Sequence, residues 1–188
     1  AFLIFWEFMS LSSFILVLFE NEKQEVIESS IIYFVSMHLS VIFLIIGVIL
    51  LSNNTMSFSF SSIKELVESN KEIALIISIL FIIGFSIKAG FFPFHIWLPK
   101  AHPAAPSHIS AIMSGVMIKT GIYGILRIIY YLKIPDVTFS YVFLIFSLIT
   151  AFVGIMLSIT QNDIKKLLAY SSVENIGIIG IGISFGML

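Results

Sequence analysis

The chain has 188 residues, of which 59% are hydrophobic and 11% are charged, and its formal net charge is −1. Soluble domains carry about 25% charged residues, so this composition indicates a protein that crosses a membrane several times. The near-neutral charge argues against binding of nucleic acid. The absence of cysteine excludes disulfides, thiolate metal sites and iron–sulfur clusters within these residues. We therefore expect no cofactor in this chain, and redox chemistry would belong to a partner.

Six segments are long and apolar enough to cross a membrane as helices, because about 20 apolar residues span the hydrocarbon core. In chain order, the predicted crossings are 1-19, 30-52, 72-98, 106-132, 138-160 and 164-187. The fold class is therefore predicted to be all-α, a polytopic transmembrane helix bundle. Ala1 already lies inside an apolar run, so we interpret residues 1-188 as a single transmembrane domain internal to a longer subunit.

The third crossing is predicted to be a broken helix. Gly90 and Pro93 fall inside it, and Pro93 has no N–H group to donate to the carbonyl of Ala89. The helix should therefore end just after Lys88 and leave free carbonyl groups near its ammonium. A break at membrane depth is tolerated where it is buried in protein or lines a wet cavity, and a charge beside it favours an ion site. A simple proline kink is the alternative.

Several charged residues fall at predicted membrane depth. Lys119 lies in the middle of the fourth crossing, far from both ends of the helix. A lysine at this depth costs about 2.5–3.5 kcal/mol on insertion scales and is a functional-site hypothesis by default. Lys88, Glu7 and Glu174 are further charges of the same kind.

Glu7, in the segment FWEFMSLSSF, needs a cation if it is buried. Lys88 and Lys119 are its natural partners. Burial favours the neutral form of a lysine, whereas a nearby carboxylate favours the ammonium, so a change in their separation would load or release a proton. The alternatives are that Glu7 lies at an interface near a helix end and that the lysines form purely structural ion pairs.

His108 precedes Lys119 by eleven residues, about three helical turns, so a straight helix places both on one face together with Gly115. His108 could then exchange protons with a file of water leading to Lys119. It could equally be a hydrogen-bonded histidine at the start of the helix. His38, alone in an apolar crossing, is most simply a hydrogen-bonded core residue.

Glu174 lies about two helical turns beyond Lys166 with no cation within one turn on its own helix. A carboxylate there should be protonated, paired with another helix or hydrated, and it could also serve packing alone. We expect no metal site, because the histidines around the proline-rich bend match no compact ligand pattern.

Two segments carry a family likeness. KAGFFPFHIWLPKAHPAAPSHISAIMSGVMIKTGIYGILR resembles the signature of the antiporter-like membrane subunits of respiratory complex I, multisubunit cation/proton antiporters and membrane-bound nickel–iron hydrogenases. NDIKKLLAYSSVENIG resembles a later helix of the same family. The likeness covers nearly the whole chain. The residue patterns of both segments are most similar to those of the membrane subunit of the formate hydrogenlyase or hydrogenase-4 type.

The resemblance implies specific roles. Glu7 matches the family glutamate that pairs with the lysine of the broken helix, here Lys88, and Lys119 matches the central lysine of the next helix. The family core has two inverted repeats of five helices, so this chain would hold the last four helices of one repeat and the first two of the other. The partners would be other membrane subunits, peripheral redox subunits and the lipid bilayer, and the location a prokaryotic cell membrane.

The resulting hypothesis is a proton-translocating membrane subunit of a redox-driven complex, of the group 4 nickel–iron hydrogenase type. Glu7, Lys88 and Lys119 would form the proton relay, with His108 and Glu174 as candidate relay or access residues. The chain would be the non-redox membrane component of an oxidoreductase. Two alternatives stay open: a Na⁺/H⁺ antiporter or complex I antiporter-like subunit, moving protons or Na⁺, and a passive membrane anchor for a peripheral enzyme.

Overall fold

The computed structural model describes residues 1–132 and 137–188, and every regular element within them is a helix. In chain order the elements are α1 (Phe2–Val17), η1 (Leu18–Glu20), α2 (Gln24–Thr55), α3 (Ser62–Ser69), α4 (Lys71–Ala89), η2 (Phe94–Trp97), α5 (Leu98–Ala104), α6 (Ser107–Ile112), η3 (Met113–Met117), α7 (Ile118–Leu132), α8 (Val137–Ile159) and α9 (Ile164–Met187). The η2 element is a 3₁₀ turn and η3 is a π-helical turn. The predicted all-α fold class is confirmed.

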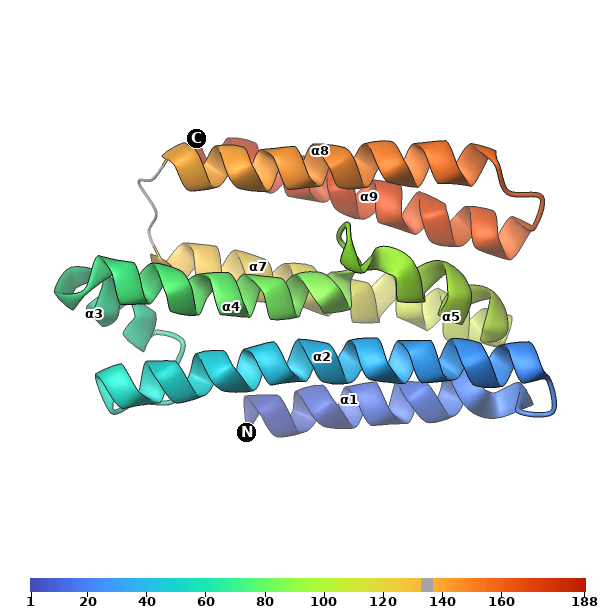
Figure 1. Ribbon diagram of the computed structural model, residues 1–188, viewed down its shortest axis with the longest axis horizontal. Coiled ribbons are helices and arrows are strands. Elements are labelled where there is room, and N and C mark those ends of the chain that lie inside the picture. Colours follow the sequence, from blue (N-terminus) through green and yellow to red (C-terminus); the bar gives the residue numbers. More distant parts are fainter. Residues whose placement is uncertain (133–136) are drawn as a thin grey trace.

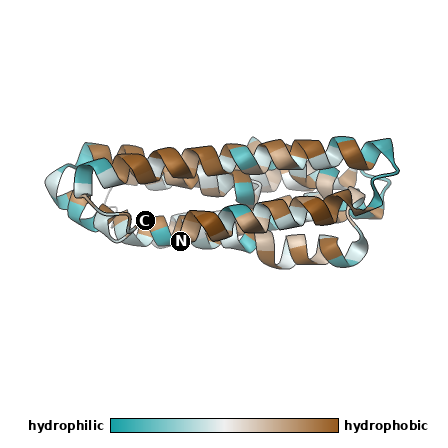
Figure 2. Ribbon diagram, turned by 90° about the horizontal axis from the view of Figure 1, so that it is seen from below, coloured by the Kyte–Doolittle hydropathy of each residue, from teal (hydrophilic) through white to brown (hydrophobic). Residues whose placement is uncertain are grey.

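The described residues contain six helical segments long and apolar enough to cross a membrane. They are Phe2–Glu20, Gln24–Thr55, Lys71–Ala104, Ser107–Leu132, Val137–Ile159 and Ile164–Met187. The six predicted crossings are therefore confirmed. The second starts earlier than predicted, because its first turns carry exposed glutamates that extend the helix beyond the apolar span. Hydrophilic residues accordingly gather at the two ends of the bundle (Figure 2).

The helices pack side by side along one direction (Figure 1). α1 packs on α2, α2 on α4 and α4 on α7, while α8 and α9 form a closely packed pair whose most extensive contact with the rest of the bundle is that of α9 with α5. Asn70 caps α4 by accepting a hydrogen bond from the Ile73 N–H at 3.2 Å, and Asp163 caps α9 in the same way. Such caps satisfy amide groups that have no partner inside the helix.

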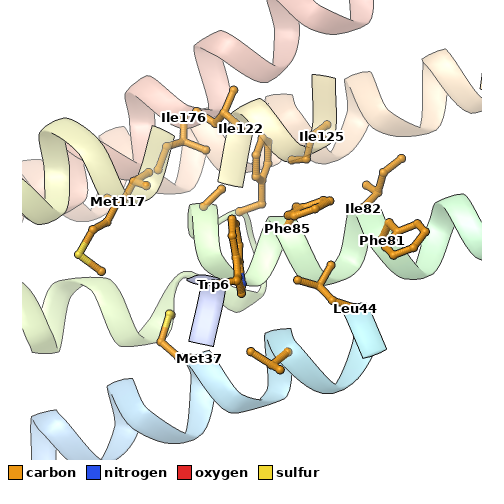
Figure 3. Close-up of a cluster of buried hydrophobic side chains, with 14 of the residues drawn as sticks. Trp6, Met37, Leu44, Phe81, Ile82, Phe85, Met117, Ile122, Ile125 and Ile176 are labelled. Atoms are coloured by element: carbon orange, nitrogen blue, oxygen red, sulfur yellow. The ribbon is translucent and has the colours of Figure 1, made fainter. Parts of the chain in front are cut away.

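The core lies where α1, α2, α4 and α7 meet (Figure 3). The ring of Trp6 from α1 meets the ring of Phe85 from α4 edge to face, with centroids 5.3 Å apart. Leu44 of α2 and Ile125 of α7 are also fully buried there. Edge-to-face aromatic pairs contribute about 0.5–1.5 kcal/mol beyond the area they bury, so this contact fixes α1 against α4.

Glycines allow α8 and α9 to approach closely. A Cβ atom at Gly177 of α9 would lie 2.3 Å from the backbone nitrogen of Ala151 in α8, and one at Gly154 would lie 2.5 Å from the backbone nitrogen of Glu174. Lipid tails supply no hydrophobic drive between helices, so association in a membrane depends on this close packing.

Gly177→Ala should therefore destabilise the α8–α9 pair, by about 1–3 kcal/mol as is typical of overpacking. The control is Gly182→Ala on the same helix, where an added Cβ would meet nothing within 4 Å. Thermal unfolding of the full-length subunit in detergent measures both. Equal melting temperatures for the two variants would contradict the prediction.

Candidate buried-charge site at the helix break

The break in the third crossing occurs at Gly90. This residue has φ of 86°, and its N–H and that of Phe91 both donate to the carbonyl of Ser86, at 2.9 and 3.1 Å. Glycine adopts this left-handed conformation at no steric cost, which is why it ends helices. Pro93 then lacks the N–H that would have continued the helix. α4 ends at Ala89, so the prediction of a broken helix in this crossing is confirmed, and Gly90 and Pro93 follow its end.

Protein groups satisfy the backbone around the break. The carbonyl of Ile87 accepts a hydrogen bond from the indole N–H of buried Trp97 at 2.9 Å. The N–H of Phe92 donates to the hydroxyl of Thr150 in α8 at 3.1 Å. An apolar groove of about 610 Å³ separates α4 from α8 on this side. The break is therefore held by protein, as membrane depth requires, and the charges gather on its opposite side, towards α1.

Lys88 is fully enclosed, with 1% of its surface exposed. Its ammonium donates to the hydroxyl of Ser10 in α1 at 2.7 Å and lies 5.4 Å from the centre of the Trp6 ring. An aromatic face attracts a cation more strongly in a desolvated site than at a surface. The two contacts that enclose the ammonium therefore come from neutral groups on one helix.

Glu7 lies one turn before Ser10 on α1, but it contacts a different helix. Its Oε1 is 2.8 Å from Nε2 of His38 in α2, while Oε2 is buried without a hydrogen-bond partner. Among the described residues no ion pair joins Glu7 to Lys88. Sequence reasoning missed His38 as a partner, since only the packing of α1 on α2 brings the two together.

Hydroxyl groups continue the polar side of α1. The Ser13 hydroxyl is 2.6 Å from the buried Tyr33 hydroxyl of α2, and it also donates to the carbonyl of Ser10 at 2.9 Å. We call Glu7, Ser10 and Ser13 the polar seam of α1. This seam places two hydrogen-bond contacts to α2 and one to α4 along a helix whose other residues, apart from Ser12, are apolar.

Lys119 does not join this group. Its side chain is exposed in this chain, and its ammonium donates to the carbonyl of Ser114 inside the π-helical turn, at 2.7 Å. Gly121 packs directly on α4, where a Cβ would lie 2.8 Å from the Phe85 carbonyl oxygen. Two helical positions correspond to about 200°, so Lys119 points away from α4 and from Lys88.

The π-helical turn also changes the relation of His108 to Lys119. A straight helix would place them on one face, but a π-helical turn takes up an extra residue and rotates the later part of the helix by about 100°. The expectation of a shared face was therefore wrong. His108 is exposed in the first turn of α6, which precedes the π-helical turn, and Lys119 follows that turn in α7.

Glu174 is half-exposed, and its backbone packs against Gly154 of α8. Its neighbour Asn175 is exposed and donates to the carbonyl of Ser171 on its own helix at 2.9 Å. A role for Glu174 stays a prediction. No group of three or more metal-ligating side chains could hold an ion within residues 1–132 and 137–188.

These features define a class: a multi-pass membrane protein whose broken helix carries a buried lysine beside a glutamate–histidine pair. Residues 1–187 match the family model described as "NADH:quinone oxidoreductase/Mrp antiporter, TM". The chain belongs to this family of antiporter-like membrane subunits, as the resemblance of its motifs had implied.

Individual relatives support the assignment. Hydrogenase-4 component B of Escherichia coli (strain K12) is 38% identical over the whole chain, which spans 28% of that protein. The structure of the Mrp complex from Dietzia sp. DQ12-45-1b superposes with a TM-score of 0.88 at 25% identity, over 97% of this chain and 35% of the other. The membrane-bound sulfane sulfur reductase, an archaeal respiratory complex, superposes with the same TM-score at 26% identity, over 97% and 38% of the respective chains.

Ser10→Ala should destabilise the site, because it removes the hydroxyl that accepts from the buried Lys88 ammonium. Hydrogen bonds to charged groups contribute about 1.5–3 kcal/mol. The matched control is Ser12→Ala, whose exposed hydroxyl donates only to the carbonyl of Met9 on its own helix. Thermal unfolding in detergent compares them, and a Ser10→Ala variant as stable as the control would show that the contact contributes nothing.

Proposed function

We propose that this chain is part of a proton-translocating membrane subunit of a redox-driven complex of the group 4 nickel–iron hydrogenase type. The observation that carries the proposal is Lys88, a fully enclosed cation at the break of a membrane helix. Polar groups at such breaks mark ion sites in many transporters. Ionisable residues at this depth are costly, and each is by default a candidate for a functional site.

The proposed chemistry uses the separation between Lys88 and Glu7. In the structure the Lys88 ammonium contacts the Ser10 hydroxyl. Glu7 lies one helical turn before Ser10 on α1, and its Oε2 is buried without a hydrogen-bond partner. A lysine side chain that moved from Ser10 to Oε2 would form an ion pair. That pair would stabilise the ammonium, and its opening would favour release of the proton. Lys88 and Glu7 would thus load and unload a proton as their distance changes.

Lys119 would be the next proton site. It faces away from α4, so the proton would pass around α7 and not directly between the two lysines. A cation at membrane depth is not left against lipid, so we propose that further segments of the full-length subunit cover this face. His108 and Glu174 would act as access or relay residues on the same route.

Sequence identity to a relative supports the proposed hydrogenase type. Hydrogenase-4 component B is 38% identical over the whole chain, and one of the superposed structures, the membrane-bound sulfane sulfur reductase, is an archaeal respiratory membrane complex. We therefore propose a prokaryotic cell membrane as the location, with other membrane subunits and peripheral redox subunits as partners. Residues 1–188 would form a single transmembrane domain, and the redox cofactors would lie outside it.

A second candidate is a Na⁺/H⁺ antiporter subunit without redox partners. The Mrp complex superposes with a TM-score equal to that of the reductase complex, so the fold favours neither. Proton movement driven by a Na⁺ gradient in the absence of any electron donor would support the antiporter. Proton movement that requires electron transfer would support the hydrogenase type.

Lys119→Ala should reduce redox-driven proton translocation while the complex still assembles. Its ammonium contacts only a carbonyl of its own helix among the described residues, so little packing is lost. Positioned proton-transfer groups contribute about 10²–10⁴-fold to rates, and we expect at least about a tenfold loss. The assay follows proton uptake by vesicles that hold the full complex. Normal pumping at normal yield would instead support a passive anchor.

Glu7→Gln should weaken proton translocation more than Glu7→Asp, because the proposed role is a negative charge near Lys88. A double-mutant cycle with Lys88→Ala tests the link, since coupled residues give non-additive losses. The loss in the double variant should be about equal to the larger single loss. Additive losses would mean that Glu7 and Lys88 act independently.

A further inference from the structure

His38 has two defined contacts in α2 and α1. Its Nδ1 lies 2.9 Å from the carbonyl oxygen of Phe34, one turn earlier on α2, and its Nε2 lies 2.8 Å from Oε1 of Glu7. The Phe34 ring packs on the imidazole, with centroids 3.9 Å apart. Both ring nitrogens are therefore engaged, and the ring is held in one orientation.

These contacts fix the number of protons in the pair. A backbone carbonyl can only accept, so Nδ1 must carry hydrogen. Nε2 and Oε1 at 2.8 Å then need one proton between them, because two lone pairs would otherwise face each other. Either Nε2 carries it, giving an imidazolium and a carboxylate, or Oε1 carries it, giving a neutral imidazole and a glutamic acid. Both arrangements have zero net charge, which suits a site at membrane depth.

We propose that His38 is the proton partner of Glu7 and that the position of their shared proton decides whether Glu7 can serve as the counter-charge of Lys88. This inference deepens the proposed function and rests on it. In the step, the Nε2–H bond breaks with its electron pair left on nitrogen, and the Oε1–H bond forms. No other atom or electron is transferred.

The two forms act differently on Lys88. With the proton on His38, Glu7 is a carboxylate whose unpaired Oε2 can receive the ammonium from Ser10. With the proton on Glu7, that negative charge is gone and cannot act as the counter-charge of Lys88. Proton transfer within the Glu7–His38 pair therefore switches the electrostatic partner of the buried lysine.

The pair also lies nearer than Lys88 to the surface of this chain. The side chains of His38 and Glu7 are 36% and 28% exposed in this chain, whereas Lys88 is 1% exposed. In the proposed route, protons would reach Lys88 through this pair, with Glu7 between His38 and the lysine.

Chemical rescue tests the proposal in vesicles that contain the full complex. His38→Ala opens a space beside Glu7 and should lower the number of protons translocated per electron pair by at least about tenfold, since positioned proton-transfer groups contribute about 10²–10⁴-fold to rates. Imidazole added to the vesicles should restore part of the loss. Pyrrole, a ring of the same size without a basic nitrogen, should not. Ser36→Ala, on the same helix with its hydroxyl bonded to Ile32, is the matched control and should pump normally.

His38→Gln covers the case in which the alanine variant fails to assemble. Glutamine can donate to Glu7 but cannot take up its proton, so assembly should be normal and translocation should fall about as far. Rescue by pyrrole as complete as by imidazole, or normal pumping by His38→Gln, would overturn the role of His38.

Lys88→Ala, measured in parallel, keeps the two proposals apart. If it abolishes pumping while His38→Gln pumps normally, the proposed function stands and the role of His38 is wrong. If Lys88→Ala and Lys119→Ala both pump normally, the proposed function itself fails, and the inference about His38 fails with it.

Discussion

Satisfaction of the Lys88 ammonium is the constraint around which the site is organised. At membrane depth no bulk water is available, so a buried cation needs polar or aromatic partners from the protein. Ser10 supplies a hydroxyl oxygen and Trp6 an aromatic face, both from α1. These contacts require α1 to lie against the last turn of α4. The aromatic contact of Trp6 with Phe85 holds the same two helices together.

The break of α4 is shaped by the same shortage of water. Gly90 and Pro93 end the helix, and each backbone group that loses its helical partner must find another within the protein. Trp97 folds back to the carbonyl of Ile87, and Thr150 reaches across from α8 to the N–H of Phe92. Side chains of neighbouring elements therefore supply the hydrogen bonds that the broken helix lacks. The result is an apolar side towards α8, where a groove separates the two helices, and a polar side towards α1.

The charged groups of the site differ in how deeply they are buried in the bundle. Lys88 is sealed in the centre, the Glu7–His38 pair lies nearer the surface, and Lys119 faces away on α7. The proposed proton route through these groups would not be a straight line of ion pairs. It needs side chains that change partners, and the unpaired Oε2 of Glu7 is the available acceptor for such a change. In the proposed relay, movement of the Lys88 side chain and of one proton would connect the Glu7–His38 pair to the centre of the bundle.

The sequence by itself determined the all-α membrane fold, the six crossings and the break, because these depend on local properties. Apolar length, the missing N–H of Pro93 and the backbone freedom of Gly90 act within a few residues of one another. The motifs also sufficed to indicate the family. Tertiary structure alone decided which charged groups meet. Glu7 pairs with His38 because α1 packs on α2 in one register, and the π-helical turn before Lys119 rotates it away from the face of His108. Residue spacing along a single helix carries no information about contacts between helices, and it assumes a regular helix that this turn interrupts.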